Sequence, residues 1–351
     1  MNIAHNIYIH VPFCMRKCNY CAFYSLACNN PDWQKYADSI CDEIKFWGEK
    51  LGNIDVPTVF FGGGTPSLMP MSVFEQIMSN LHKHFNVLED CEITLESNPG
   101  TLDKNKLSEF VSNGVNRLSV GVQSLKDDEL EFLGRIHNAA QAKDLLNNAI
   151  AMGLRVSADF IYGLPNHNEK TMDEMCTDIN KLGLQHVSMY ELTIEKNTPF
   201  GKMNLEMPDN ETMAKMYMTI SNTLNLPRYE VSNYAMPGQE CRHNQNVWAG
   251  DAYIGIGRAA AGRVFVDGVW YDEMGGFERF ETIDNKTRAE EKILTGMRTI
   301  KGVKLAEDVK SLIDFNWVNT HKNLVEEKDN YLYATPDGLL VLDNLLLDLI
   351  K

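Results

Sequence analysis

Three closely spaced cysteines carry the most distinctive chemistry in this sequence. Cys14, Cys18 and Cys21 are separated by three and then two residues, in a loop that follows the apolar run 7–9. Thiolates crowded this closely bind a soft metal, either zinc or an iron–sulfur cluster. Structural zinc usually takes four ligands in two separated pairs, and the chain has no second C-x-x-C pair. Three thiolates would instead hold three irons of a [4Fe–4S] cube and leave the fourth iron open.

An open iron is a place where a cofactor or substrate can coordinate. Two residues leave other interpretations open, because each could supply a fourth ligand. Cys28 lies seven residues after Cys21, and His10 lies just before the cysteine loop. A zinc site and a closed four-ligand cluster therefore remain alternatives to the open cluster.

Polar or glycine-rich residues follow several of the strand-like runs. Residues 62–64 are three consecutive glycines, Glu96 and Gln123 end two later runs, and Asp159 lies in a third. Glycines let backbone groups approach a ligand closely, and a carboxylate in such a place can accept ribose hydroxyls. Any one of these residues could belong to an ordinary turn or loop cap. Four consecutive strands with polar ends favour a binding site.

The elements that position these residues alternate between strands and helices. The strand-like runs cover residues 7–10, 58–61, 92–96, 117–122, 155–161 and 186–192. Six strands separated by helical patterns predict a parallel α/β sheet with right-handed crossovers. The polar strand ends favour a partial (β/α)6 barrel with its site at the carboxyl-end face. An open doubly wound sheet is the alternative.

The pattern changes after the sixth strand, which suggests three parts: residues 1–200, 201–284 and 285–351. The middle part contains a Met-rich helix at 211–224 and is otherwise expected to be irregular. The last part reads as helices followed by a short strand pair near 331–334, which suggests a winged-helix-like α+β module. It lacks the basic recognition helix of DNA-binding proteins, so a lid or packing role is the better interpretation.

Composition narrows the classes of function. The chain has 351 residues, a net charge of −15 and 44% hydrophobic residues. Such an acidic surface repels phosphate backbones, so we expect no nucleic-acid partner. No run is long enough to span a membrane, and no basic segment followed by an apolar one opens the chain. We therefore expect a cytoplasmic protein without a transmembrane segment, and leave open a transient contact with a membrane surface.

The motifs together resemble the radical S-adenosylmethionine superfamily. The resemblance is greatest to the group that contains oxygen-independent coproporphyrinogen III oxidase and its haem-chaperone relative. It covers nearly the whole chain and is carried, in order, by YIHVPFC-x-x-x-C-x-x-C, GGGTPS, LESNP, GVQS, LGR-x-H, DFIYGLP, YELTIE and CRHN-x-x-x-W. The cysteine triplet followed by GGGTPS and DFIYGLP is highly specific.

The resemblance implies roles for individual residues. Cys14, Cys18 and Cys21 would hold a [4Fe–4S] cluster whose open iron binds S-adenosylmethionine. A reduced cluster would cleave this cofactor to a 5′-deoxyadenosyl radical, which requires an electron donor. The residues implied to contact S-adenosylmethionine are Tyr8, Tyr20, Gly63, Gly64, Thr65, Glu96, Gln123, Arg135 and Asp159.

Three positions bear on the branch of this group. The oxidase carries an N-terminal extension and a further cysteine two residues after the third, where this chain has Phe23. The CRHN segment resembles the H-N-x-x-Y-W motif of the chaperone branch, but Val247 replaces its tyrosine, and Ala261 stands where relatives have a histidine. His243 is the candidate haem contact, since imidazole is a common axial ligand. A histidine bonded to nearby backbone is an equally good interpretation.

These features favour a haem chaperone that binds haem as cargo and transfers it to acceptor haemoproteins. The alternative is an oxygen-independent coproporphyrinogen III oxidase, an enzyme that makes protoporphyrinogen IX. A third hypothesis is a closed-cluster electron carrier, which would have no use for the glycine run.

Overall fold

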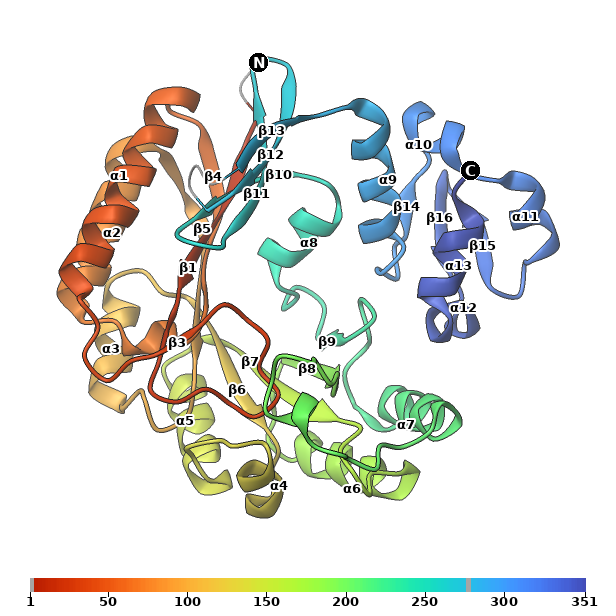
Figure 1. Ribbon diagram of the computed structural model, residues 1–351, viewed down its shortest axis with the longest axis horizontal. Coiled ribbons are helices and arrows are strands. Elements are labelled where there is room, and N and C mark those ends of the chain that lie inside the picture. The colour runs from red at the N-terminus through yellow and green to blue at the C-terminus, as the bar shows by residue number, and fades with distance from the viewer. Residues whose placement is uncertain (1–2, 276–278) are drawn as a thin grey trace.

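An eleven-stranded sheet organises the chain. The computed structural model describes residues 3–275 and 279–351. The sheet runs in the order β13-β12-β11-β10-β1-β4-β5-β6-β7-β8-β9 and curves into an open horseshoe (Figure 1). Its six successive parallel strands are β1 (His5–Val11), β4 (Asp55–Gly63), β5 (Asn86–Ser97), β6 (Arg117–Gln123), β7 (Arg155–Tyr162) and β8 (His186–Glu191).

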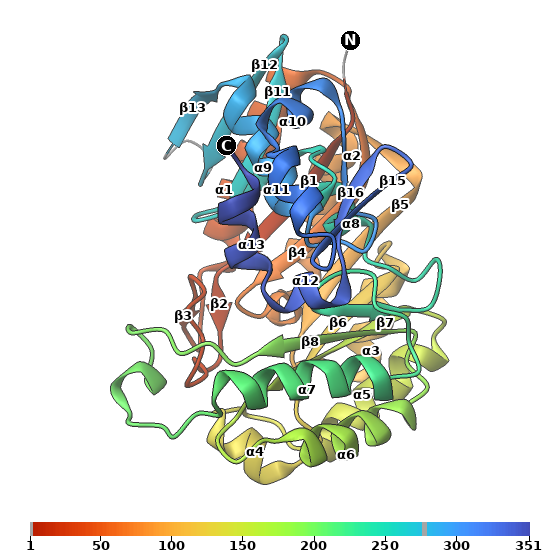
Figure 2. The same cartoon turned by 90° about the vertical axis from the view of Figure 1, so that its right-hand side faces the viewer.

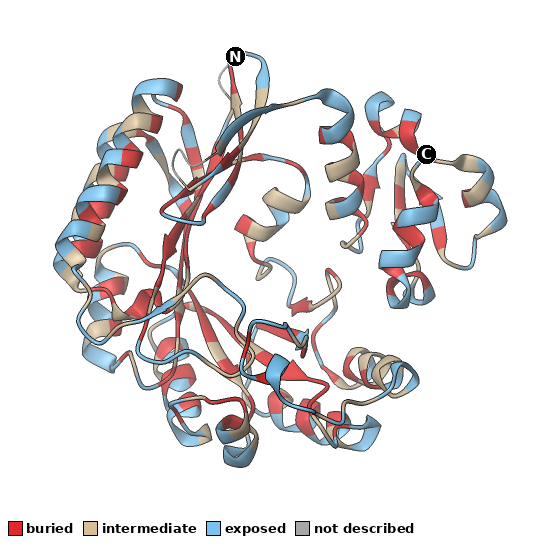
Figure 3. Ribbon diagram, viewed as in Figure 1, coloured by how far each residue is buried: buried red, intermediate tan, exposed pale blue. Residues whose placement is uncertain are grey.

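Helices cover the outer face of this sheet. Figure 1 shows them on the convex side of the horseshoe, and Figure 3 shows that they bury the face turned toward the strands. They are α1 (Trp33–Leu51), α2 (Met71–His84), α3 (Lys104–Ser112), α4 (Asp127–Phe132), α5 (Ala139–Ala151), α6 (Glu169–Asn180) and α7 (Asn210–Thr223), with short 3₁₀ turns η1 (Pro66–Leu68) and η2 (Phe200–Lys202).

The strand order distinguishes the two predicted architectures. A doubly wound sheet reverses its strand order at a switch point. Here β1, β4, β5, β6, β7 and β8 are neighbours in strict chain order, and consecutive pairs are parallel. The sheet is not closed, because its two edge strands, β13 and β9, lie at opposite ends of the strand order and do not pair with each other (Figure 1). The partial (β/α)6 barrel is therefore confirmed, and the doubly wound alternative is wrong.

Residues 201–284 are more regular than we expected. After β9 (Asn233–Ala235) and α8 (Arg242–Trp248), the strand β10 (Ala252–Ile256) pairs in parallel with β1. The antiparallel strands β11 (Ala261–Val266), β12 (Val269–Met274) and β13 (Arg279–Ile283) then extend the sheet. Short glycine-flanked runs such as AYIGI have weak local preference and become strands only through tertiary pairing. The sequence pattern could not reveal that partner, whereas the Met-rich helix was predicted correctly as α7.

The last part of the chain forms a small module with its own core. It contains α9 (Asn285–Gly296), β14 (Val303–Lys304), α10 (Glu307–Leu312), α11 (Phe315–Thr320), β15 (Val325–Lys328), β16 (Tyr331–Ala334), α12 (Pro336–Leu340) and α13 (Leu342–Leu349). A three-stranded sheet, β14-β16-β15, lies beside these helices (Figure 2). Their shared core contains buried residues such as Ile293, Ile313 and Leu332. The helices and the strand pair expected from the sequence are present. Among the described residues, no helix combines the length and apolar character needed to cross a membrane.

Candidate functional site

The cysteine loop is fixed at both of its ends. It leaves the carboxyl end of β1 through β2 (Phe13–Cys14), which pairs in parallel with β3 (Leu26–Ala27). The Cys28 amide donates to the Cys14 carbonyl at 2.9 Å. Further along the loop, the Asn19 side chain donates to the Phe132 carbonyl at 2.8 Å, and the Asn19 amide donates to the Leu133 carbonyl at 3.0 Å. The loop is therefore anchored to α4, across the open face of the barrel.

The three predicted ligands share one environment. Cys14 is buried, Cys18 and Cys21 are half-buried, and all three are free thiols. Burial raises the pKa of Cys14, and the neighbouring Cys21 and Cys18 raise it further, while a hydrogen bond from Thr65 (Oγ1 to Sγ, 3.6 Å) opposes the shift. In the part of the chain that the structure describes, no three His, Cys, Asp or Glu side chains are already arranged to hold a metal ion. Cys18 and Cys21 are thus near enough to Cys14 to raise the pKa of its thiol.

The structure distinguishes between the two candidates for a fourth cluster ligand, His10 and Cys28. Both ring nitrogens of His10 are engaged, Nδ1 with the Tyr8 hydroxyl at 3.0 Å and Nε2 with the Tyr24 carbonyl at 2.9 Å. His10 is therefore a poor candidate to close a cluster. Cys28 is half-buried, and its backbone lies beside that of Cys14. It remains the alternative that requires an experiment.

The glycine run ends β4 directly against the cysteine loop. Gly63 has a φ of +116°, and a Cβ there would lie 2.6 Å from the His10 ring. A Cβ on Gly64 would lie 2.7 Å from the Phe13 carbonyl oxygen and 3.0 Å from the Cys14 sulfur. These contacts are too close for any side chain larger than hydrogen. The bare backbone is therefore required for the approach of the cysteine loop to β4.

Glu96 connects this run to the interior of the barrel. Its Oε2 accepts a hydrogen bond from the Gly63 amide at 2.9 Å. Burial raises the pKa of Glu96 to about 7, and the charge of Asp159 adds to this effect, although the bond from Gly63 opposes it. The carboxyl group is thus placed to change protonation near neutral pH.

Arg135 forms hydrogen bonds that link the cysteine loop to the end of β6. Its Nη1 donates to the Cys18 sulfur at 3.3 Å and to the Tyr20 hydroxyl at 3.4 Å, and its Nη2 donates to Asn98 and to the Gly121 carbonyl at 2.7 Å. A Cβ on Gly121 would lie 2.9 Å from the Gln123 amide nitrogen. Gln123 has a φ of +68°, which is uncommon for a residue with a side chain. This strained end of β6 therefore places Gln123 beside Arg135, close to the cysteine loop.

Asp159 lies in a ring of serine hydroxyls inside the barrel. It accepts hydrogen bonds from Ser119 at 2.9 Å and from Ser157 at 3.1 Å. Burial raises the pKa of Asp159, while hydrogen bonds from Ser188 and Ser119 oppose the shift. The carboxyl group therefore lies on the interior wall of the barrel, as its place in β7 predicts.

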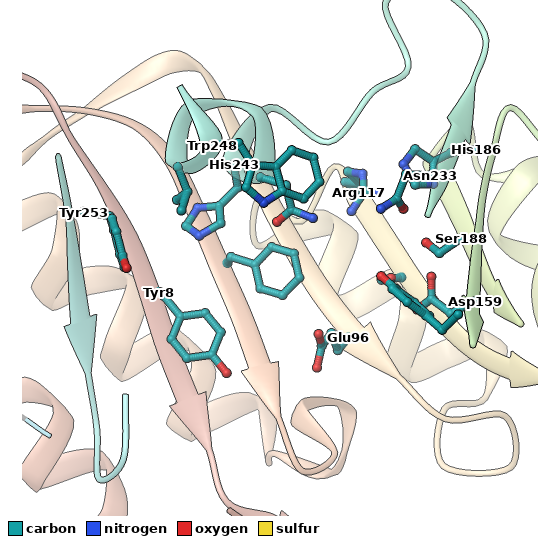
Figure 4. A pocket seen from close by; sticks show the side chains of 15 residues that line it. Tyr8, Glu96, Arg117, Asp159, His186, Ser188, Asn233, His243, Trp248 and Tyr253 are labelled. Carbon is teal, nitrogen blue, oxygen red and sulfur yellow. The ribbon is translucent and has the colours of Figure 1, made fainter. Parts of the chain in front are cut away.

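Tyr8, Glu96 and Asp159 line one cavity of about 320 Å³ (Figure 4). Arg135 instead borders a second cavity of about 350 Å³, together with Arg16 and His137. The predicted cofactor residues thus fall into two neighbouring groups. One group faces the barrel interior, and the other lies under the cysteine loop.

His243 lies on α8, which closes the far side of the first cavity. Its Nδ1 bonds to the Thr58 hydroxyl at 2.8 Å, and its ring lies 5.2 Å from that of Phe60. Burial lowers the pKa of His243 to about 4, so the ring is neutral. Val247, Trp248 and Tyr253 line the same cavity. His243 is thus on a helix rather than in irregular chain, and Nε2 is the ring nitrogen left for a ligand.

The interior of the barrel is largely polar. Trp248 and Tyr253 line the first cavity, whereas Phe265 packs on Trp270 with ring centroids 5.2 Å apart. The cavity is also lined by a set of polar residues that the sequence analysis missed: Arg117, Ser119, His186, Ser188, Asn233 and Asn244. A period of two along buried strands could have revealed the first four, since the runs RLSVG and HVSMY alternate polar and apolar residues.

Comparison with known proteins identifies the family. The Radical SAM superfamily profile matches residues 8–179. The chain is 35% identical over 272 residues to the heme chaperone HemW of Escherichia coli, an alignment that covers 75% of this chain and 71% of the relative. The chain belongs to the HemW family of radical SAM proteins. The HemW of Bacillus subtilis is 29% identical and matches over 95% of this chain and 96% of its own length.

A solved structure supports the same fold for this HemW relative. Coproporphyrinogen III oxidase (HemN) from Escherichia coli superimposes with a TM-score of 0.82, over 99% of this chain and 90% of the oxidase, at 17% sequence identity. That identity is too low to carry function, so the likeness concerns the fold alone.

Membership of the radical SAM superfamily implies a [4Fe–4S] cluster and S-adenosylmethionine. The residues present fit both groups. Three thiols lie on one loop, a bare glycine backbone faces the Cys14 sulfur, and a buried Arg135 donates to the Cys18 sulfur. The Arg135 Nε also has no hydrogen-bond partner among the described residues, so a donor under the loop is left for a ligand.

Proposed function

We propose that this protein is a haem chaperone of the radical SAM type, which binds haem and transfers it to acceptor haemoproteins. The observation that carries the proposal is the 35% identity to heme chaperones named HemW over three-quarters of the chain. Phe23, 71% exposed on the cysteine loop, stands where the oxidase branch has a further cysteine, which also favours the chaperone.

In this proposal Cys14, Cys18 and Cys21 hold the cluster, and the cofactor lies between the cysteine loop and the barrel interior. The cluster would supply one electron to S-adenosylmethionine. The chain's own residues bind and orient the cofactor: Gly63, Gly64 and Thr65 border its methionine part, and Tyr8 lies beside it. Its other contacts would come from Tyr20, Glu96, Gln123, Arg135 and Asp159. The Arg135 guanidinium, bonded to Cys18, also offsets negative charge on the cluster thiolates.

Haem would contact His243 through Nε2, since Nδ1 is held by Thr58. The cavity in front of this histidine, about 320 Å³, is at the small end of the range for ligand pockets. A complete tetrapyrrole is larger than this space. We therefore propose that haem reaches His243 only if α8 moves outward, and that the closed cavity holds part of the ligand.

The alternative function is oxidation of coproporphyrinogen III, the activity of the other branch of the group that the sequence motifs resemble. One experiment separates the two functions. Anaerobically reconstituted protein is given haem, and its Soret band and transfer to an apo-haemoprotein are recorded; a second sample receives coproporphyrinogen III, reductant and S-adenosylmethionine. We expect a shifted Soret band with transfer, and no protoporphyrinogen IX. Steady decarboxylation without haem binding would replace the chaperone proposal with the oxidase.

The remaining parts of the proposal concern location and partners. We propose a cytoplasmic protein that meets an electron donor and haemoprotein acceptors. With a net charge of −15, nucleic acid is not among its partners. We also propose the division into residues 1–200, 201–284 and 285–351 as functional parts, although β10 to β13 extend the same sheet as the first part.

A further inference from the structure

Arg117 is a buried cation at the inner end of the barrel cavity. It begins β6 and lies opposite Thr94 in the register, two residues before Ser119, which lies opposite Glu96. Because side chains alternate along a strand, Arg117 and Ser119 point to the same interior face. Only 2% of Arg117 is exposed, and its side chain lines the cavity near Asn233 and His186 (Figure 4).

The guanidinium of Arg117 has no hydrogen bond or ion pair with any of the described residues. A guanidinium carries five N–H donors, and a buried charge without partners is costly. The nearby carboxylates are already engaged. Glu92 pairs with Arg155 at 2.7 Å and accepts the His243 amide at 2.9 Å, and Asp159 accepts the serine hydroxyls described above.

These carboxylates balance the charge of Arg117 through space without using its donors. Glu92 and Asp159 are among the groups that raise the pKa of Arg117, after Cys241, despite its burial. The guanidinium is thus charged and its N–H groups face the cavity. Asn244 on α8 lines the same cavity, and its side-chain amide likewise has no hydrogen bond with any residue that the structure describes.

The chemistry of the cavity favours one class of ligand group. A guanidinium fork matches the two oxygens of a carboxylate. A dianion is disfavoured, because Glu96 and Asp159 line the same cavity and repel additional negative charge. The aromatic rings of Phe60 and Trp248 on the cavity wall would contact an apolar part attached to the carboxylate.

We propose that Arg117 is the carboxylate receptor of the barrel cavity. The carboxylate comes from one of two sources, a free small carboxylic acid or the propionate arm of a tetrapyrrole. The second source rests on the proposed haem function, and the first does not. In the second case a propionate arm enters the closed cavity while the macrocycle stays outside it, which agrees with the volume available.

The first test uses sodium propionate as the probe on the full-length protein. The melting temperature is measured against propionate concentration, with sodium chloride at the same ionic strength as reference. We expect a saturable rise for the wild type, no rise for Arg117→Met, and roughly tenfold or more weaker binding for Arg117→Lys, which keeps the charge but loses the fork. Arg242→Met is the matched control. Arg242 lies on α8, and its substitution also removes one positive charge. Its guanidinium, however, pairs with Asp90 at 3.2 Å and does not line the cavity, so propionate binding should be unchanged.

The second test compares haemin with haemin dimethyl ester, whose propionates are blocked. Weaker binding of the ester to the wild type, together with weaker binding of haemin to Arg117→Lys, identifies the propionate arm as the source. If propionate binding depends on Arg117 but haemin binds equally well to the wild type and to Arg117→Lys, the source is a free carboxylic acid.

Equal effects of propionate and chloride on the wild type would overturn the proposal and leave Arg117 hydrated by cavity water. Equal propionate affinity in the wild type and Arg117→Lys would also overturn it, even if Arg117→Met fails to fold. Failure of haemin to bind any variant would contradict the proposed function, while the propionate titration still decides the role of Arg117.

Discussion

As a proposed contact of S-adenosylmethionine, Glu96 is expected to make the binding of this cofactor depend on pH, and one substitution isolates the effect. The pKa of its carboxyl group is raised from 4.5 to about 7, chiefly by burial. This difference corresponds to roughly 3 kcal/mol between the two protonation states. Without cofactor, ionised Glu96 lowers the stability of the folded protein. The penalty begins above the unfolded pKa, near 4.5, and is complete above about 7.

Ionised Glu96 accepts a hydrogen bond from the Gly63 amide and would accept others from the proposed cofactor, whereas the protonated form would accept them more weakly. With a pKa of about 7, the ionised fraction falls from about nine-tenths at pH 8 to about one-tenth at pH 6. We therefore expect the affinity of the wild type for S-adenosylmethionine to fall by roughly tenfold from pH 8 to pH 6. The Glu96→Gln variant should lack this tenfold fall, because its side chain does not ionise.

Anaerobic equilibrium dialysis of the reconstituted protein with labelled cofactor measures both affinities. The amino group of S-adenosylmethionine also titrates in this range, but it does so equally for the two proteins. The ratio of wild-type to Glu96→Gln affinity therefore reports Glu96 alone. A ratio that stays constant from pH 6 to pH 8 would refute the assignment of Glu96 as a cofactor contact that must ionise.

Two further predictions concern the cysteine loop. Cys14→Ala, Cys18→Ala and Cys21→Ala should each abolish the cluster, whereas Cys28→Ala should retain about four irons per chain. Iron and sulfide analysis measures this, and loss of iron in Cys28→Ala would show a closed four-thiolate site. Gly64→Ala should lose the cluster as well, because the new Cβ meets the Phe13 carbonyl and the Cys14 sulfur. Gly62→Ala, whose Cβ would lie nearest to side-chain atoms of Tyr8 and Phe60 and not to the cysteine loop, should keep the cluster; equal iron content in both variants would contradict the steric argument.

Much of the barrel could be predicted because its strands and helices carry local signals. The runs 92–96 and 117–122 lie within β5 and β6, and the polar residues Glu96, Gln123 and Asp159 lie in β5, β6 and β7. The sequence also predicted that the three cysteines lie in a loop after the first strand, and this loop follows β1. In each of these cases a short stretch of sequence contains the physical cause of the structure.

The rest depends on partners that are distant in sequence. The strand β10 forms because β1 lies beside it, and nothing in AYIGI specifies that neighbour. Both ring nitrogens of His10 are engaged through the fold, with Tyr8 and with the Tyr24 carbonyl, so the sequence left it as a candidate ligand. Arg117 looked like an ordinary strand residue, because its lack of a partner becomes visible only once the surrounding strands are in place.

The central position of β1 has a consequence for the order of events during synthesis. Asn6 on β1 donates a side-chain hydrogen bond to the Ala252 carbonyl on β10, 246 residues later. At a translation rate of about 5–20 residues per second, roughly 12–50 s pass before that partner emerges from the ribosome. Throughout this interval one edge of β1 has no neighbouring strand, and unpaired strand edges promote aggregation. The strand that carries the cysteine loop is therefore made first and paired along its second edge late, so nascent chains should be a stage at which aggregation through β1 competes with folding.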